Sequence, residues 1–233
     1  MSESENVYDA IAEAYAESVE DNVWNAHYER ANSLRLVGDV RGRSVLDAGC
    51  GPGAHAAALT DGGATVTGID RSSALLSIAA TRLGDRATFV QGDLSDPLPL
   101  EDQSFDVVLA ALVMHYLRDW VPTLTEFHRV LIPEGRLVIS THHPALSHVI
   151  GAGDDYFAIY EIDDEWEVGD TVARMRYWHR PLSAISRALK ESGFMIEQIE
   201  EPLPAAIVRE IDPSAWKKLT KQPWFLFIVA RPA

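Results

Sequence analysis

A glycine-rich loop between a predicted strand and a predicted helix constrains this chain more than any other segment. The loop, residues 47–53 (DAGCGPG), follows the apolar residues Val45 and Leu46 and precedes an alanine-rich run at 54–59. β-branched and apolar residues favour a buried strand, and alanine favours a helix. Glycines permit positive φ angles and let a ligand approach the main chain, while the free N–H groups of a helix start attract negative charge. The segment therefore predicts a ligand-binding turn in an α/β fold.

Two kinds of nucleotide cofactor are compatible with this loop. Residues 51–56 (GPGAHA) fit the G-x-G-x-x-A form of a dinucleotide fingerprint, which is weak evidence by itself. Asp47, two residues before the first glycine, supplies a carboxylate that would repel a phosphate and attract an ammonium group. The pattern Asp47-x-Gly49-x-Gly51-x-Gly53 resembles motif I of the class I S-adenosylmethionine-dependent methyltransferases, whose cofactor carries an amino acid end and no phosphate. We favour that interpretation over a nicotinamide cofactor.

Strand-like and helix-like segments alternate along most of the chain, which is typical of a parallel sheet covered by helices on both faces. We predict strands at residues 43–46, 64–69, 87–90, 105–111, 136–140, 194–199 and 224–230. The expected fold is α/β, with a seven-stranded, mostly parallel, Rossmann-like sheet. The family resemblance implies that the last strand runs antiparallel.

Two segments lie outside this alternating pattern, within a chain of 233 residues that we expect to form a single domain. Apolar residues about one helical turn apart predict an amphipathic helix near residues 6–21, inside an N-terminal helical cap at 1–35. Alternating residues on either side of Gly169 and Asp170 predict a β-hairpin. We interpret residues 145–180 as a lid inserted after the fifth strand.

Three aspartates follow predicted strands at the edge where ligands bind in open α/β sheets. Asp47, Asp70 and Asp93 each come at a strand end. A single aspartate there is usually a turn residue, but three at these intervals are hard to assign to turns alone. Asp70 can accept the hydroxyl hydrogens of a ribose, and Asp93 with Leu94 can hold an adenine.

The family resemblance extends over about residues 40–142. It rests further on the segments 68–72 (GIDRS), 91–94 (QGDL), 105–108 (FDVV) and 129–137 (RVLIPEGRL). It implies S-adenosyl-L-methionine as the cofactor, and it implies contacts from Asp47, Gly49, Cys50, Gly51, Gly53, Asp70, Arg71, Asp93, Leu94 and the main chain of Ala110 and Ala111. Tyr15 and the segment 28–30, which includes Arg30, sit where relatives often contact the cofactor's carboxylate. Tyr15 is equally explained as an aromatic on a buried helix face.

Composition narrows the possible partners. The formal net charge of −15, without any concentrated run of Lys and Arg, argues against a nucleic-acid substrate. Cys50 is the only cysteine, so no disulfide forms within the chain, and we interpret Cys50 as a packing residue as well as a loop residue. The N-terminus lacks the pattern of a secretory signal, and no apolar run is long enough to span a membrane. We therefore expect a cytoplasmic protein with a small-molecule substrate and no membrane association.

Histidines are the candidates for a catalytic base, because histidine titrates near neutral pH. His115 follows the fourth predicted strand, His142 follows the fifth, and His179 lies in the lid. His115 also has an ordinary hydrogen-bonding explanation, since relatives commonly carry histidine there. Neighbouring histidines at 142 and 143 lack further ligands at useful spacing, so we predict no metal.

The predicted lid combines aromatic and acidic residues. Aromatic residues such as Trp166 and Tyr177 either line an apolar substrate pocket or give the hairpin its own core. Acidic residues such as Asp163 and Asp164 form either a solvated face or, with the aromatics, a site that suits a cationic amine.

These observations predict transfer of a methyl group from S-adenosylmethionine to an oxygen, nitrogen or carbon atom of a small molecule. One alternative is a non-catalytic S-adenosylmethionine-binding protein that acts through a partner. The other is a nicotinamide-dependent oxidoreductase. The sequence does not identify the acceptor or the oligomeric state, because a shared fold supports many functions.

Overall fold

The computed structural model describes residues 7–233, and its central feature is a seven-stranded sheet. The strands follow the spatial order β3 (Ala87–Gln91), β2 (Thr65–Asp70), β1 (Ser44–Ala48), β4 (Phe105–Ala111), β5 (Leu131–His142), β9 (Phe225–Pro232) and β8 (Phe194–Glu200). The ladders from β3 to β5 are all parallel, whereas β9 runs antiparallel to both of its neighbours. The predicted sheet and its antiparallel last strand are confirmed.

The fifth strand is longer than the sequence predicts. β5 begins at Leu131, which pairs with Phe105, and regular pairing resumes only where Arg136 meets Val107. The residues between, which include Pro133 and Gly135, form an irregularity inside the strand rather than a turn before it. Proline lacks the N–H that a regular ladder needs, which explains the interruption.

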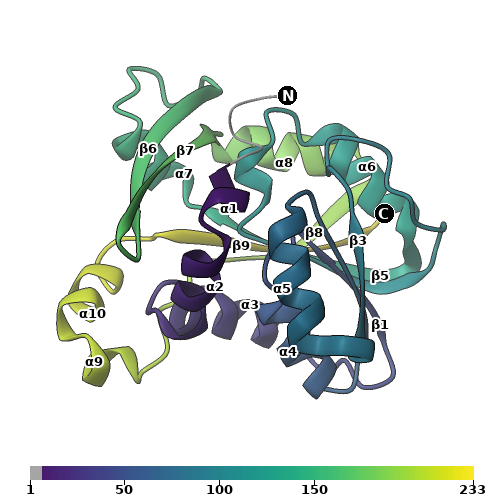
Figure 1. Ribbon diagram of the computed structural model, residues 1–233. Helices are drawn as coiled ribbons and strands as arrows, with labels where there is room; N and C mark the ends of the chain where they lie inside the picture. The colour runs from purple at the N-terminus through teal and green to yellow at the C-terminus, as the bar shows by residue number, and fades with distance from the viewer. Residues whose placement is uncertain (1–6) are drawn as a thin grey trace.

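Helices cover both faces of the sheet, as Figure 1 shows. One core joins the sheet to α6 (Val121–Val130) and α8 (Leu182–Glu191), and it contains Phe127 and Leu189. The other core joins the sheet to α3 (Ala31–Val37), α4 (Ala54–Asp61) and α10 (Pro213–Leu219). α5 (Ser73–Leu83) packs beside β3, and the short α9 (Val208–Ile211) packs against α10. With both faces covered, the site must lie at the strand ends.

The predicted N-terminal helix is interrupted at Ile11. The structure has α1 (Val7–Ala10) and α2 (Ala12–Asp21), followed by a π-helical turn at Asn25–Arg30. Residues 1–6 of the predicted cap lie outside the described residues. α1 and α2 pass in front of the sheet and beside α5 (Figure 1).

The predicted hairpin forms a separate two-stranded antiparallel sheet. β6 (Tyr160–Val168) and β7 (Thr171–His179) are joined at Gly169, whose φ of +58° explains the glycine, and α7 (Pro144–Ile150) precedes them. Ile11 packs with hairpin residues such as Ile162 and Tyr177 in a third, smaller core. The hairpin and the N-terminal helices therefore pack against each other over the end of the main sheet (Figure 1).

Candidate active site

The carboxyl ends of the central strands meet at a cavity of about 160 Å³. Most of the sequence-predicted cofactor residues line it. These are Tyr15, Arg30, Gly49, Cys50, Gly51, Asp70, Arg71, Asp93 and Leu94. Asp47, Gly53 and Ala110 do not line this cavity; Asp47 and Ala110 are buried in β1 and β4, and Ala111 lines the wall beside Ala110. The tertiary fold thus gathers four strand ends and the N-terminal helices around one space.

The glycine loop has a backbone that other residues would strain. Gly49 and Gly51 have φ angles of +73° and +51°. A Cβ at Gly49 would lie 2.4 Å from Cγ2 of Val113, so that glycine is required by packing. A Cβ at Gly51 would meet no described atom within 4 Å, and Gly51 lines the cavity. Gly51 therefore presents bare main chain to open space, as a ligand cradle requires.

Two strand-end aspartates are held in place by backbone N–H groups. Asp70 accepts hydrogen bonds from the N–H groups of Gly51 and Ser72, both at 2.9 Å. Burial raises the pKa of Asp70, although these two donors oppose the rise. Asp93 accepts a bond of 2.8 Å from the N–H of Ser95. Each carboxylate keeps lone pairs for a further donor, such as a hydroxyl or an amino group.

Asp47 is a buried carboxylate that lacks a partner. The residue is 1% exposed, and neither carboxylate oxygen finds a hydrogen bond among residues 7–233. Burial raises its pKa to about 6; the positive charge of His55 and the nearby backbone N–H of Ala56 oppose this rise, and the negative charges of Asp70 and Glu29 add to it. An unpaired buried carboxylate is costly, and a cationic group nearby would offset that cost.

Glu29, which lies in the segment 28–30 expected near the cofactor's carboxylate, forms a polar centre with His55, which the sequence reasoning did not single out. The Glu29 carboxylate accepts hydrogen bonds from the hydroxyls of Ser33 at 2.5 Å and Ser140 at 2.6 Å, and His55 Nε2 lies 2.9 Å from its other oxygen. Burial alone would raise the pKa of Glu29, but His55 and the two hydroxyls outweigh it and lower the pKa. Burial would likewise lower the pKa of His55, and Glu29 reverses the direction. Both side chains line the 160 Å³ cavity at the strand ends.

Of the contacts that Glu29 makes, only the one with Ser33 could be predicted from the sequence, because residues four apart share a helix face. The other partners come from α4 and β5, which the sheet topology brings beside the π-helical turn. No sequence signal marks that encounter.

A second and larger cavity, of about 490 Å³, lies between the N-terminal helices, the hairpin and the ends of β4 and β5. It shares Tyr8, Tyr15, Asn25, Leu112 and Tyr116 with the smaller cavity. The hydroxyls of Tyr8 and Tyr116 lie 2.6 Å apart and the rings of Tyr8 and Tyr15 lie 4.9 Å apart, so these tyrosines form the common wall. The two cavities are therefore adjacent.

His115 and His142 line the larger cavity and stack on each other, with ring centroids 4.0 Å apart. His115 is 3% exposed, and neither of its ring nitrogens has a hydrogen-bond partner in the described part of the chain. Burial, with repulsion from His142, places the pKa of His115 well below its ordinary value, and burial lowers the pKa of His142 to about 4. Both imidazoles are therefore neutral near pH 7.

His179 lies apart from both cavities. It is fully buried at the end of β7, with Nδ1 2.7 Å from the Ser147 hydroxyl and Nε2 2.8 Å from the Tyr156 carbonyl oxygen. Both ring nitrogens are thus engaged in joining the hairpin to α7 and its following loop. The structure does not bring this candidate base to the site, because its position in the hairpin directs it toward α7.

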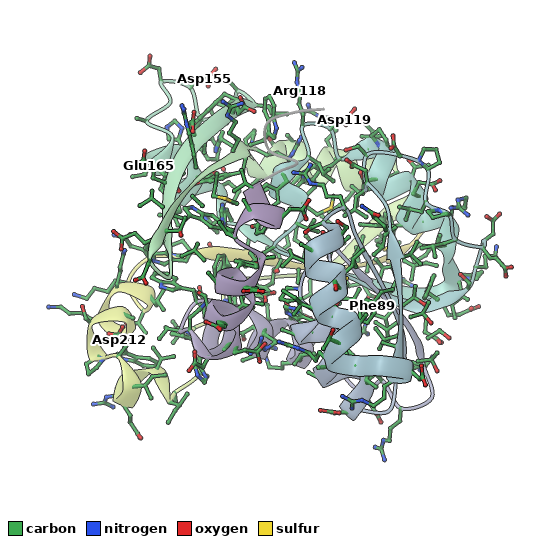
Figure 2. The ribbon with its side chains drawn as sticks, in the orientation of Figure 1. Phe89, Arg118, Asp119, Asp155, Glu165 and Asp212 are labelled. Carbon is green, nitrogen blue, oxygen red and sulfur yellow. The ribbon has the colours of Figure 1, made fainter. Side chains whose placement is uncertain are left out.

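The hairpin presents different residues to its two sides because successive strand residues face opposite ways. Asp164 and Trp166 line the larger cavity, and Asp163 pairs instead with Arg174 across the hairpin. Glu165 stands on the outer side of the hairpin, as Figure 2 shows. One Asp164 oxygen accepts hydrogen bonds from the Trp166 indole N–H at 3.0 Å and from the Tyr177 hydroxyl at 2.8 Å.

Residues 7–233 contain no group of three or more His, Cys, Asp and Glu side chains that could hold a metal ion. None of the helices there is long and apolar enough to cross a membrane.

Comparison with known proteins gives consistent matches. Residues 46–139 match a family model described as a methyltransferase domain. A demethylmenaquinone methyltransferase of Lactococcus lactis is 37% identical over 55% of this chain and 54% of its own length. An S-adenosylmethionine-dependent methyltransferase from Mesorhizobium loti has a similar structure, with a TM-score of 0.69 and 28% identity over 86% of this chain and 96% of that one. A Listeria monocytogenes structure, described as a putative S-adenosylmethionine-dependent methyltransferase, gives a TM-score of 0.77 at 24% identity, covering 88% and 96% of the two chains.

Proposed function

This chain belongs to the class I S-adenosylmethionine-dependent methyltransferase family, and on that premise we propose that it methylates a small molecule bound in the larger cavity. The smaller cavity would hold S-adenosylmethionine, whose sulfonium supplies an electrophilic methyl group. The observation that carries the proposal is that two cavities share one wall, with the family's cofactor motif on one side and an aromatic cavity on the other.

The residues of the smaller cavity fit the proposed cofactor part by part. Gly51 offers bare main chain, and the Asp70 carboxylate has lone pairs for the ribose hydroxyls. Asp93 and Leu94 supply an acceptor and an apolar contact for the adenine. The unpartnered carboxylate of Asp47 lies behind the glycine loop and would balance the positive charge of the ammonium group. Arg71 and Arg30 also line this cavity, and we propose that they contact the ribose and the carboxylate ends respectively.

His115 and His142 are the residues we propose for handling a proton of the acceptor. Both face the larger cavity, both are neutral near pH 7, and both ring nitrogens of His115 lack partners within the described chain. A neutral imidazole in this position can accept a proton from an acceptor that must lose one. His179 is left out of this proposal because both of its nitrogens are already engaged.

Isothermal titration calorimetry with S-adenosylmethionine and S-adenosylhomocysteine tests the cofactor site. We expect both to bind, and we expect Asp70→Ala to weaken binding by at least about tenfold, as loss of a charged hydrogen-bond acceptor does. The exposed acid Asp85 provides the matched control, and Asp85→Ala should leave both affinities unchanged. A folded wild-type protein that binds neither compound would refute the proposal. Release of S-adenosylhomocysteine with an acceptor would show that the protein is an enzyme rather than a binding protein.

We also propose a cytoplasmic location and a single domain with an N-terminal cap at 1–35 and a lid at 145–180. The buried single cysteine and the net charge of −15 support a reducing compartment and a substrate other than nucleic acid. Cell fractionation and limited proteolysis test these two points. Membrane-bound protein, or cleavage into two stable halves, would contradict them.

A further inference from the structure

The larger cavity has an acidic lining. Its acidic residues are Asp164 and Glu167, while the lining histidines His115 and His142 are neutral near pH 7. Among its lining residues in the described part of the chain, none is Lys or Arg. A carboxylate or phenolate acceptor would lose its hydration there beside two acidic side chains, without a cation among the lining residues to compensate. Lys218 stacks on the lining ring of Trp224, 4.3 Å from its centroid, but does not itself line the cavity.

Asp164 is fixed in orientation by its neighbours. Besides the two bonds from Trp166 and Tyr177, it accepts a bond of 3.0 Å from the N–H of Glu165 on its other oxygen. A carboxylate has about four acceptor sites, so about one remains open. The side chain is only partly buried, and Asp164 lines the cavity. The open site suits one further donor.

Aromatic rings surround the same carboxylate. The His142 ring lies 4.7 Å from the ring of Tyr177 and 6.1 Å from that of Trp166, and Phe225 stacks 6.1 Å from His142 on another side. The faces of such rings attract cations, and their area accommodates an apolar body. His115 lines the same cavity, and both of its buried ring nitrogens lack hydrogen-bond partners in the described part of the chain, so the cavity wall carries unsatisfied polar atoms that a ligand could reach.

We infer that the methyl acceptor is an amine on an apolar or aromatic body, with its nitrogen held between the Asp164 carboxylate and the surrounding rings. This inference rests on the proposed function. The nitrogen reacts as the free base, after the ammonium form has given its proton to the neutral imidazole of His115 or His142, which passes it to solvent. Its lone pair forms the new N–C bond, the electron pair of the broken C–S bond stays on sulfur, and the positive charge passes to nitrogen. Asp164 and the rings stabilise that charge as it develops.

Binding of isosteric probes to the wild-type protein tests the inference without turnover and without a variant. The probes are 2-phenylethylammonium, 2-phenylethanol and 3-phenylpropionate, added to protein saturated with S-adenosylhomocysteine. Trp24, Trp166 and Trp224 line the cavity, so tryptophan fluorescence reports occupancy. We expect the ammonium probe to bind at least about tenfold more tightly than the other two, as a charge pair in a partly desolvated site allows. Tightest binding by the carboxylate or the alcohol, or no binding by the ammonium probe, would overturn the inference.

A pair of adjacent acids supplies the matched variants. Asp164→Asn keeps an acceptor for Trp166 and Tyr177 but removes the charge, and we expect it to reduce the ammonium affinity about tenfold. Asp163→Asn removes a charge from the other side of the same strand, where Arg174 pairs with it, and should change nothing. Trp166→Leu keeps the charge and removes a ring, so it should also weaken ammonium binding. It serves as the test if Asp164→Asn proves unstable. Equal ammonium affinity in wild type, Asp164→Asn and Trp166→Leu would refute the assignment.

The two proposals fail in different ways. If S-adenosylhomocysteine binds by calorimetry and a phenol or carboxylate is methylated while the amines are not, only the amine inference fails. If neither cofactor form binds, the proposed function itself fails. Release of S-adenosylhomocysteine with secondary or tertiary phenylalkylamines, and its loss in Asp164→Asn but not in Asp163→Asn, supports both.

Discussion

Replacing Asp47 with asparagine should stabilise the protein without its cofactor while weakening the cofactor site. Asp47 is 1% exposed and lacks hydrogen bonds within residues 7–233, and its pKa rises from 3.8 to about 6. That rise corresponds to about 3 kcal/mol lost by the folded state when the group is ionised. The asparagine amide would bring its own unpaired donors, at a cost of about 1–2 kcal/mol. We therefore expect a net gain of about 1–2 kcal/mol at pH 8 for Asp47→Asn.

The sign of the pH dependence follows from the direction of the shift. Because the folded pKa of Asp47 lies above the unfolded value, the folded state binds more protons between pH 3.8 and about 6. The Asp47 contribution to wild-type stability is fully present below pH 3.8 and is lost as the pH rises through about 6. The advantage of Asp47→Asn should thus be greatest at pH 8 and should turn into a disadvantage of about 1–2 kcal/mol near pH 4, where only the cost of the asparagine donors remains.

Thermal unfolding of the two proteins across this pH range is the assay. A gain of 1–2 kcal/mol raises the melting temperature of a chain of this size by about 2–8 °C. In the same variant, the affinity for S-adenosylmethionine should fall about 30-fold, because a buried charge pair would contribute about 2 kcal/mol. Asp85→Asn, which removes an exposed acid, should change neither quantity. An Asp47→Asn protein that is less stable than wild type at pH 8, or equally altered at both pH extremes, would refute the reasoning.

Three further predictions concern single residues. Gly51→Ala should lower the free energy of unfolding by only about 1 kcal/mol, because its Cβ meets no described atom and only the positive φ costs energy. Calorimetry should nevertheless show clearly weaker S-adenosylmethionine binding. Unchanged affinity would contradict the proposal that bare main chain at Gly51 contacts the cofactor. His142→Asn should reduce the rise of wild-type stability between pH 4 and 6.5, because the unfolded chain binds a proton there that the folded His142 does not; the rise due to His115 should remain. Denaturant titrations at several pH values measure the rise, and an unchanged dependence of stability on pH would contradict the prediction. His179→Ala should lower the melting temperature, because the Ser147 hydroxyl and the Tyr156 carbonyl oxygen lose their partner at a cost of about 1–3 kcal/mol in unfolding free energy. Cofactor affinity should stay unchanged. A loss of affinity with an unchanged melting temperature would instead place His179 at the site.

Local chemistry made the cofactor side of the molecule predictable. The three alternate glycines and the acids Asp70 and Asp93 sit within a few residues of strand ends, and parallel strands bring such ends to one edge. The hairpin was predictable for the same reason, since Gly169 marks the turn and alternation marks the strands. The irregular start of β5 was less predictable, because it depends on the register in which that strand pairs with β4.

Other parts of both cavities depended on encounters between distant segments. In the smaller cavity, Glu29 meets Ser140 and His55 only because the fold brings the π-helical turn at Asn25–Arg30 beside α4 and β5. His179 and His115 were both candidates for a catalytic base in the sequence. In the structure His179 contacts the Ser147 hydroxyl, whereas His115 lines the larger cavity.

The sequence by itself determined the sheet, the glycine loop and the acids around it, because strand propensity, glycine torsions and turn chemistry act over a few neighbouring residues. The tertiary structure alone decided that Asp164 rather than Asp163 faces the cavity, and that His115 and His142 stack beside it. Those outcomes depend on the side from which the hairpin packs against α1 and α2, and that choice is made by burial of apolar surface across the whole molecule.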